Sequence, residues 1–566
     1  MEPLLRIADL SIDFVSDSTV TRAVSNVSFA VEKGEIVALV GESGSGKSVT
    51  SLAVLQLLPR PPARYASGQL LFKEDEKSPV DLLRLSPEKM RRIRGAKIAM
   101  IFQEPMSSLN PVISCGRQVM EALLVHKNIS KAAAREQTIR WFAKVELPDP
   151  EKIFDRYPHQ LSGGQKQRVM IAMAMCCEPS LLICDEPTTA LDVTVQKTIL
   201  ELIRSLQQEQ NMGVIFITHD LGVVAQIADR VVILYKGEIV EEGTVDTIFQ
   251  QAKHPYTKAL IACRPALHPR GERLPTVRDY LEEKTGEVQP KKSNATRPQQ
   301  NGEALIRVQD LSVQFPAQTS FFGKPRSLVT AVDRVSFSLF QNETLGLVGE
   351  SGCGKTTLGR TLLRLIEPSS GHIFYKDNDI TGLSKAAVRQ LRKDVQLIFQ
   401  DPYSSLNPRL TVGDAIAEPM LVAGLETSAR ERRKKVAALL EKVNLSQGMM
   451  NRYPHEFSGG QRQRIVIARA LALNPGFVVC DESVSALDVS VQAQVLNLLN
   501  DLKKELGLTL LFISHDLSVV RYMCDRIMVM KAGRIVESGD AESVYQHPKN
   551  DYTRTLIDAV PKLKTP

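Results

Sequence analysis

Short apolar segments of strand length recur along the chain, separated by polar turns. Their residues are β-branched or alternate between apolar and polar positions, which is typical of strands. They cover Leu10–Val15, Val24–Val31, Ile36–Val40, Leu181–Cys184, Val214–Thr218 and Val231–Tyr235. Helical patterns lie between them, at Ser48–Leu58 and from Pro111 to about Ala174. Strands that alternate with helices predict an α/β fold, a parallel-sheet core with a helical insertion.

The whole pattern occurs twice. Cys-Asp-Glu ends an apolar run at Glu186 and again at Glu482, 296 residues later (482 − 186). His219 in Thr-His-Asp and His515 in Ser-His-Asp are separated by the same offset (515 − 219). A constant offset over so much chain indicates duplication of a whole domain. We expect one domain over 4–266, which includes a short C-terminal extension, and a second over 305–560 with its own extension.

The stretch between the copies, 267–304, is predicted to be a flexible linker. Its part from Thr285 to Ala304 carries Pro, Asn, Gln, Lys and Glu with almost no apolar residues, so it cannot bury enough surface to order itself. The first copy also holds an insertion, and the charged stretch Lys73–Pro79 is the expected surface loop.

Composition narrows the class of protein. With 566 residues, 43% hydrophobic and 24% charged, the chain is an ordinary globular protein with room for two α/β domains. The net charge of +7 is mild for this length and does not by itself indicate nucleic-acid binding. No apolar run approaches the roughly 20 residues that span a bilayer. Eight cysteines without a C-x-x-C pair predict reduced thiols in a cytosolic protein.

Two glycine-rich loops carry the clearest chemistry, and each follows an apolar strand. The loops are Gly41, Glu42, Ser43, Gly44, Ser45, Gly46, Lys47 and Ser48, and Gly349, Glu350, Ser351, Gly352, Cys353, Gly354, Lys355 and Thr356. Both are complete G-x-x-x-x-G-K-[ST] motifs, in which backbone N–H groups cradle phosphates and the lysine adds charge near the β- and γ-phosphates. The final hydroxyl suits Mg²⁺. Two such motifs in one chain predict two nucleoside triphosphate sites.

Two acids end an apolar strand in each copy, Asp185 with Glu186 and Asp481 with Glu482. The aspartate suits a Mg²⁺ shell, and the glutamate suits polarising an attacking water. His219 and His515 each follow a further strand and could hydrogen-bond a γ-phosphate. The alternatives are a surface turn for the acids and a structural role for the histidines. The recurrence of the set beside each phosphate loop disfavours both alternatives.

A Ser-Gly-Gly turn opens a helix in each copy, at Ser162, Gly163, Gly164 and Gln165 and at Ser458, Gly459, Gly460 and Gln461. Free N–H groups and the helix dipole make such a turn an anion site. A capped helix start is the alternative, since serine is a good N-cap. Each copy already has a phosphate loop, so a second anion site makes sense if it completes the site of the other copy.

In this order, and twice, the motifs resemble those of ABC transporter ATP-binding subunits. The set comprises Walker A, the Q-loop glutamine (Gln103; Gln400), the LSGGQ signature, Walker B, the D-loop (Ala190–Asp192; Ala486–Asp488) and the switch histidine. More narrowly, the segments Phe102–Pro111 and Phe399–Pro408, Arg-Tyr-Pro-His before each signature and the tail His254–Thr257 resemble the oligopeptide, dipeptide, nickel and glutathione importer group. The resemblance covers nearly all of the chain except the linker.

The resemblance implies tandem P-loop NTPase domains, each with a RecA-like core, a helical subdomain and a small antiparallel β subdomain. The two are expected to close head to tail on two ATP molecules, one between Lys47 and Ser458 and the other between Lys355 and Ser162. The implied catalytic residues are Glu186, Glu482, His219, His515, Gln103 and Gln400. The implied Mg²⁺ ligands are Ser48, Gln103, Asp185, Thr356, Gln400 and Asp481. Neither site looks degenerate by motif, so both should hydrolyse ATP.

Three departures or open points accompany the resemblance. Many relatives hold an iron–sulfur cluster on a cysteine ladder after the Tyr-Thr segment, but here only Cys263 lies near it, so no cluster is expected. Ser483 stands where the first copy has Pro187. Phe14 and Phe315 are candidates to stack on adenine, and are equally interpretable as core residues of a strand.

The function implied is that of an ATPase energising a membrane importer, with oligopeptides or dipeptides first and glutathione or nickel next. The implied partners are two membrane-spanning permease subunits and, indirectly, a solute-binding protein, with the chain at the cytoplasmic face of the inner membrane. No nucleic-acid partner is expected. The alternative, a soluble tandem ATPase acting on ribosomes or DNA, is disfavoured by a short, weakly basic linker. A non-hydrolysing scaffold is disfavoured by two intact catalytic sets.

Overall fold

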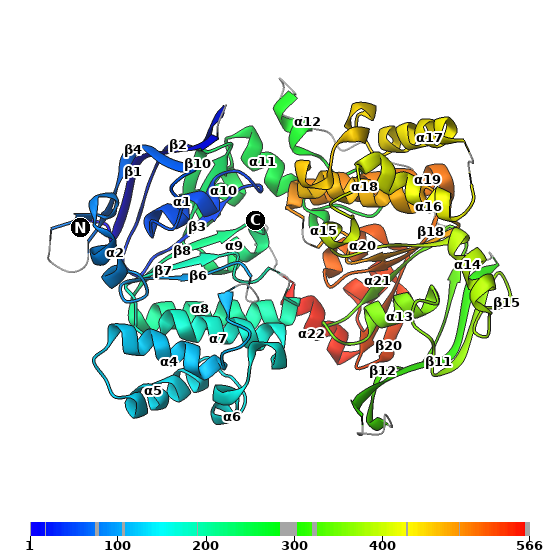
Figure 1. Ribbon diagram of the computed structural model, residues 1–566, viewed down its shortest axis with the longest axis horizontal. Coiled ribbons are helices and arrows are strands. Elements are labelled where there is room, and N and C mark those ends of the chain that lie inside the picture. The colour runs from blue at the N-terminus through cyan, green and yellow to red at the C-terminus, as the bar shows by residue number, and fades with distance from the viewer. Residues whose placement is uncertain are drawn as a thin grey trace.

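Two similar halves lie side by side in the computed structural model, the first on the left and the second on the right of Figure 1. The structure describes residues 2–16, 19–73, 78–104, 108–189, 191–282, 303–319, 325–425, 428–485 and 487–560. We call 2–282 the first half and 303–560 the second half. Most of the predicted linker (283–302), four residues of the predicted surface loop (74–77) and Ala190 and Ala486 of the D-loops lie outside the described residues.

The large sheet of the first half has the order β10-β9-β3-β8-β7-β6. Its strands are β3 (Ile36–Val40), β6 (Ile98–Ile101), β7 (Leu181–Asp185), β8 (Gly213–Thr218), β9 (Arg230–Tyr235) and β10 (Glu238–Thr244). Neighbours are parallel except for the β9–β10 hairpin. Every residue of β3, β7 and β8 is buried, which explains their nearly continuous apolar sequences.

The large sheet of the second half repeats this topology, with the order β16-β17-β18-β13-β19-β20. Its strands are β13 (Thr344–Val348), β16 (Val395–Ile398), β17 (Phe477–Asp481), β18 (Thr509–Ile513), β19 (Arg526–Lys531) and β20 (Arg534–Asp540). The central strand is again the one that leads into a glycine-rich loop. The prediction of a duplicated α/β core is therefore confirmed.

A small antiparallel sheet accompanies each large one. The first contains β1 (Leu5–Ser16), β2 (Thr19–Val31), β4 (Ala63–Phe72) and β5 (Val80–Asp81), and the second contains β11 (Ala304–Thr319), β12 (Pro325–Phe340), β14 (Ser370–Tyr375) and β15 (Asn378–Asp379). The predicted strands Leu10–Val15 and Val24–Val31 are the apolar parts of β1 and β2. The structure extends β2 through the exposed residues Thr19–Arg22, and it extends β1 back to Leu5, where the buried Leu5 and Ile7 alternate with a polar residue.

Helices pack against the sheets and form the inserted subdomains. The first half contains α1 (Lys47–Val54), α2 (Pro87–Ile93), α4 (Cys115–His126), α5 (Lys131–Lys144), α6 (Pro150–Asp155), α7 (Gly163–Met175), α8 (Val193–Gln210), α9 (Leu221–Ile227), α10 (Val245–Gln251), α11 (Pro255–Ala262) and α12 (Val277–Glu282). The second contains α13 (Lys355–Leu362), α14 (Lys385–Asp394), α15 (Pro402–Ser405), α16 (Val412–Val422), α17 (Ala429–Lys442), α18 (Gly459–Leu471), α19 (Val489–Leu506), α20 (Leu517–Met523), α21 (Ala541–Gln546) and α22 (Asp551–Ala559). Short 3₁₀ turns lie at Leu82–Arg84, Pro158–Gln160, Pro265–Leu267, Gln447–Asn451 and Pro454–Glu456.

Helix α1 is shorter than predicted. It ends at Val54 rather than Leu58, and Gln56 then adopts a left-handed backbone with φ of 50°, a conformation that does not continue a right-handed helix. Apolar periodicity continues through Leu58 and therefore does not mark this end. Within the described residues, no helix combines the length and the apolar character needed to cross a membrane.

The C-terminal helices of each half reach across to the other half. Helix α11 contacts α19, and α22 contacts α8, as Figure 1 shows for the red α22 beside the end of α8. One apolar cluster includes residues of both halves, among them Val40, Tyr256 and Leu274 of the first half and Leu499 and Val520 of the second. The halves therefore share a core at their junction.

Residues 267–282 differ from the predicted linker, because they pack on the second half. Leu274 and Val277 are buried, and the N–H and C=O of Leu274 bond the Asn497 side chain at 3.0 and 2.8 Å. Arg273 pairs with Asp501 at 2.8 Å. The buried Leu274 and Val277, together with these polar contacts, hold the segment here because a partner surface is available. We call 267–282 the strap.

Candidate functional site

Each glycine-rich loop joins a central strand to the following helix, β3 to α1 and β13 to α13. Gly46 and Gly354, at the start of these helices, have φ of 102° and 108°. A Cβ there would lie 2.9 Å from the Ala23 carbonyl oxygen and 2.2 Å from that of Ala331. Only glycine fits both the backbone conformation and the space, which explains the second fixed glycine of each motif.

The loop lysines fold back over their own loops. Lys47 Nζ donates to the carbonyl oxygens of Gly41 and Glu42 at 2.7 and 2.8 Å, and Lys355 donates to Gly349 and Glu350 at the same distances. Both side chains are buried. Burial lowers the pKa of Lys47 from its ordinary value, although several acids nearby oppose this.

A hydroxyl and a carboxylate meet at the end of each strand that carries the paired acids. Ser48 Oγ donates to Asp185 Oδ1 at 3.1 Å, and Thr356 Oγ1 donates to Asp481 Oδ1 at 3.0 Å. Burial raises the pKa of Asp185 to about 6, and it also raises the pKa of Asp481. Hydroxyl and carboxylate oxygens are the ligands that Mg²⁺ prefers, so the predicted pairs are chemically suited to that ion.

Glu186 is the centre of a polar cluster in the first half. Gln103 Nε2 and Thr189 Oγ1 both donate to its Oε2 at 3.0 Å, and His219 Nδ1 lies 3.3 Å from its Oε1. Burial alone would raise the pKa of Glu186, but the hydrogen bond and charge of His219, with the Lys47 charge, lower it to about 2. Burial likewise opposes protonation of His219, yet Glu186 holds its pKa above the ordinary value.

The second half repeats the glutamine and histidine contacts around Glu482, whereas Ser485, the counterpart of Thr189, donates to the Glu482 backbone carbonyl at 2.9 Å. Gln400 Nε2 donates to Glu482 Oε2 at 2.8 Å, and His515 Nδ1 lies 3.4 Å from the same oxygen. The pKa of Glu482 is lowered and that of His515 is raised, each against the effect of burial. The structure therefore brings together, in both halves, the glutamine, glutamate and histidine that the sequence singled out.

Both glutamates have a left-handed backbone, which the sequence did not indicate. Glu186 and Glu482 each have φ of 47°, an uncommon conformation for a residue with a long side chain. Their N–H groups donate to the carbonyl oxygens of Ile217 and Ile513, each at 3.0 Å. The strained turn directs each glutamate away from the preceding aspartate and toward the histidine.

The two signature turns cap helices α7 and α18. Ser162 Oγ accepts from the Gln165 N–H at 3.3 Å, and Gln165 Oε1 accepts from the Ser162 N–H at 3.1 Å. Ser458 and Gln461 form the same pair of bonds at 3.4 and 3.1 Å. Within the described residues, no hydrogen bond or ion pair joins a signature to the opposite phosphate loop. The predicted sharing of ATP by these two motifs therefore stays a prediction.

The halves do contact one another at their phosphate loops. The N–H of Ser43 donates to Asp488 Oδ2 at 3.0 Å, and the N–H of Ser351 donates to Asp192 Oδ1 at 2.6 Å. Each aspartate directly precedes the long helix α19 or α8 of the opposite half. Because the two contacts are reciprocal, the halves are arranged head to tail across an approximate two-fold axis.

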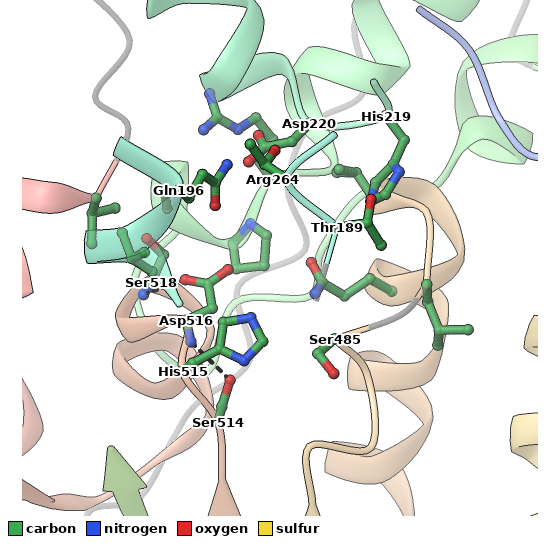
Figure 2. Close-up of a pocket in the computed structure, with 18 of the residues that line it drawn as sticks. Thr189, Gln196, His219, Asp220, Arg264, Ser485, Ser514, His515, Asp516 and Ser518 are labelled. Carbon is green, nitrogen blue, oxygen red and sulfur yellow. Dashed lines mark hydrogen bonds between the residues drawn. The ribbon is translucent and has the colours of Figure 1, made fainter. Parts of the chain in front are cut away.

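A cavity of about 140 Å³ lies between the halves near this axis. Figure 2 shows His219, Asp220 and Arg264 of the first half facing His515, Asp516 and Ser485 of the second. The two histidines that contact Glu186 and Glu482 thus border one common space. Val560 also lines it, at the position that corresponds to Arg264.

The remaining candidates have mixed environments. Phe14 packs partly against the first-half core, whereas Phe315 is 39% exposed, and adenine stacking by either ring stays a prediction. Cys353 is buried in its loop with its Sγ 3.9 Å from Lys355 Nζ. Burial raises the pKa of Cys353, which keeps the thiol protonated.

Comparison with known proteins shows which family this chain with two P-loop halves belongs to. The ABC transporter family matches residues 24–189 and 332–485, and the C-terminal region of oligopeptide/dipeptide transporters matches 240–289 and 536–566. The glutathione import ATP-binding protein GsiA of Pectobacterium atrosepticum is 49% identical over 559 residues, 99% of this chain and 89% of that protein. GsiA of Escherichia coli K12 is 48% identical over 565 residues, with the same coverage.

A solved structure, the dimeric ATP-binding cassette MJ0796 bound to ADP and Pi, matches with a TM-score of 0.38 and 26% identity, covering 42% of this chain and 98% of that one. The two family matches and the two relatives together show that the chain belongs to the ABC transporter ATP-binding family. It is an ATPase of this family with two fused nucleotide-binding halves, and its C-terminal regions are of the oligopeptide/dipeptide transporter type.

Proposed function

We propose that this chain hydrolyses ATP to drive uptake of a small peptide through a membrane permease, with glutathione as the first substrate to test. Two relatives named for glutathione import match it over 99% of its length, and its C-terminal regions match those of oligopeptide/dipeptide transporters. The observation that carries the proposal is the reciprocal contact between each phosphate loop and an aspartate of the other half. Nickel is the second candidate, from the importer group alone.

Each half contributes the same chemical groups to hydrolysis. We assign Glu186 and Glu482 to polarising the attacking water, because each is held ionised beside a histidine. His219 and His515 orient that water and the terminal phosphate. Gln103 and Gln400, bonded to the glutamates, link this cluster to the helical subdomain and so to the permease.

The phosphates of ATP are assigned to the two phosphate loops, Gly41–Ser48 and Gly349–Thr356, and to the signatures of the opposite halves, Ser458–Gln461 and Ser162–Gln165. Helix starts with exposed N–H groups suit this role. ATP would then join the halves through its γ-phosphate, and hydrolysis would release them. Strap and linker keep the halves at high effective concentration.

The pairs Ser48 with Asp185 and Thr356 with Asp481 would hold Mg²⁺, with Gln103 and Gln400 as further ligands. The described residues contain no group of three or more His, Cys, Asp or Glu side chains placed to hold a metal. A nucleotide-bound Mg²⁺ needs only one or two protein carboxylates, because phosphates and waters complete its shell. The ion supplies neutralisation of the charge that develops on the phosphates.

The proposed partners are two permease subunits that dock beside Gln103 and Gln400, with a solute-binding protein acting through them. This places the chain peripherally at the cytoplasmic face of the inner membrane. The soluble alternative, acting on ribosomes or DNA, is not favoured by either family match.

Uptake in cells tests the proposal. A strain lacking the gene is complemented with the wild-type chain or with the Glu186→Gln plus Glu482→Gln variant, and accumulation of labelled glutathione, a labelled dipeptide and ⁶³Ni²⁺ is measured. We expect the wild type alone to restore peptide uptake. If the wild-type chain restores nickel uptake only, nickel replaces small peptides as the proposed substrate. If the deletion leaves all uptake unaffected, the importer role is rejected.

A further inference from the structure

A tyrosine near the C-terminal end of each half, Tyr256 or Tyr552, contacts the phosphate loop of the same half. Tyr256 belongs to the segment His254–Thr257, which has no role in the function described so far. Tyr256 in α11 accepts a hydrogen bond on its hydroxyl from the backbone N–H of Glu42, at 3.0 Å. Tyr552 in α22 accepts one from the N–H of Glu350, at 3.1 Å. The same contact is thus made in both halves, between residues 214 and 202 positions apart in the chain.

Both tyrosines are fixed in place by a chain of contacts from the sheet. Glu241 in β10 accepts the N–H groups of Lys253 and His254 at 2.7 and 3.1 Å. His254 Nδ1 then accepts the N–H of Tyr256 at 3.2 Å, so that it caps α11. The first turn of this helix is therefore anchored to the edge of the large sheet, and Tyr256 cannot move independently of it.

The second half builds the same anchor with partly different residues. Glu537 in β20 accepts the N–H groups of Lys549 and Asn550 at 2.8 and 3.1 Å. Asn550 Oδ1 accepts the N–H of Tyr552 at 2.9 Å. Asparagine replaces histidine as the cap, yet the tyrosine hydroxyl reaches the same loop amide. The geometry of the hydroxyl, rather than the identity of its supports, is what the two halves share.

Burial makes the tyrosine–loop bond consequential. Tyr256 is fully buried and packs on Tyr235, with ring centroids 4.3 Å apart, and Tyr552 is 8% exposed. A buried backbone N–H that loses its acceptor carries a desolvation cost. Removing the hydroxyl would therefore leave the loop amide of Glu42 or Glu350 without its partner.

Adjacent amides of each loop are held from two sides. In the first loop the Glu42 N–H bonds Tyr256 of the same half, and the Ser43 N–H bonds Asp488 of the other half. Helix α11 also contacts α19, the helix that starts directly after Asp488. The Ser45 N–H donates within the loop to the Glu42 carbonyl oxygen at 3.1 Å, so the backbone around Glu42 is held by three hydrogen bonds.

We propose that Tyr256 and Tyr552 are positioning residues for nucleotide binding, which set the shape of the phosphate loops and tie it to the opposite half. This inference rests on the proposed assignment of ATP to those loops. The tyrosines touch no reacting atom, so their loss should weaken binding of nucleotide without altering the chemical step.

The test uses the full chain with Tyr256→Phe, Tyr552→Phe and the double variant, which retain the buried rings. Tyr235→Phe is the matched control, because it removes a hydroxyl from the neighbouring ring and leaves the Tyr256–Glu42 bond intact. Fluorescent ATP-analogue titration gives Kd, steady-state hydrolysis gives KM and kcat, and thermal unfolding is followed with and without ATP. We expect the double variant to raise Kd and KM about fivefold, the loss of one hydrogen bond, with kcat within twofold.

The expected pattern also includes an ATP-induced rise in Tm that is smaller than in the wild type, while Tyr235→Phe behaves as the wild type. Unchanged Kd and KM in the double variant, with a lower Tm that ATP raises by the normal amount, would overturn the proposal and leave a packing role. Failure of the wild type itself to bind the analogue would instead reject the proposed ATP sites.

Discussion

The two halves share most of the contacts around their phosphate loops and differ in several side-chain contacts at their junction. The loop lysines make the same two bonds at the same distances, and the glutamate clusters differ by at most about 0.2 Å in their paired contacts. By contrast, the strap extends from the first half onto the second, and Arg264 faces the shared cavity where the second half has Val560.

The difference indicates that duplication has preserved one set of contacts and released another. Ser490 donates to the Glu42 carboxylate across the junction, whereas Thr194 Oγ1, its counterpart, is buried without a hydrogen-bond partner. Asn497 clamps Leu274 of the strap, and its counterpart Glu201 is exposed. Each of these hydrogen bonds needs to form only once, because the halves are joined in a single chain.

Replacing the two glutamates should have the largest effect. Glu186→Gln plus Glu482→Gln should retain ATP binding and lower turnover roughly 10²–10⁴-fold, because the group that polarises water is lost. The matching glutamine and histidine contacts of the two clusters predict similar losses in the two single variants. Phosphate release and analogue binding are the measurements. Parental turnover in the double variant would refute the assignment, and unequal singles would show that the two sites are not equivalent.

The next largest effect is expected from substitutions that release the strap. The loss of stability should occur only for the residue of the second half that binds the strap. Asn497→Ala removes both bonds to Leu274 in a buried setting and should lower the free energy of unfolding by about 1–3 kcal/mol. Glu201→Ala, at the corresponding exposed position, should change it by less than about 0.5 kcal/mol. Thermal unfolding of both variants measures the difference, and equal effects would remove the distinction between the copies.

Most substitutions of buried residues lower the free energy of unfolding, but replacing the buried Asp185 should raise it. Its folded-state pKa of about 6 lies above the ordinary carboxyl value, so the native state binds the proton more tightly than the unfolded chain. Stability is therefore lost as pH rises toward 6 and stays lower above it. Asp185→Asn should stabilise the nucleotide-free chain at pH 7.5 by about 1–3 kcal/mol while impairing hydrolysis. A gain in Tm that persists unchanged at pH 4 would contradict this explanation.

The smallest expected effect compares the two hydroxyls at the junction. Ser490→Ala removes the donor to the buried Glu42 carboxylate and should destabilise the chain by about 1 kcal/mol. Thr194→Ala removes a hydroxyl that has no partner and should be neutral or slightly stabilising. Chemical unfolding with a common m-value is the measurement. An equal loss of stability in both variants would show that the Thr194 hydroxyl forms an equivalent hydrogen bond in solution.

Much of the fold followed from local pattern, because strand length, the repeat offset and the loop motifs are all written in neighbouring residues. The meeting of Gln103, Glu186 and His219 was also predictable, since parallel strands end at one edge of a sheet. The left-handed backbone of Glu186 was not, because nothing in its sequence distinguishes it from an ordinary strand end. The Tyr256–Glu42 bond and the strap depend on surfaces that only the folded chain brings together.

The reciprocal bonds between Ser43 and Asp488 and between Ser351 and Asp192 have a consequence for genetics. A missense change at codon 488 would be mapped to the second gene repeat, yet its defect would be felt by the first phosphate loop. The loop residue that such a change affects, Ser43, is encoded 445 codons upstream. Complementation between alleles damaged in different repeats cannot be interpreted repeat by repeat, because each phosphate loop is contacted by a residue encoded in the other repeat.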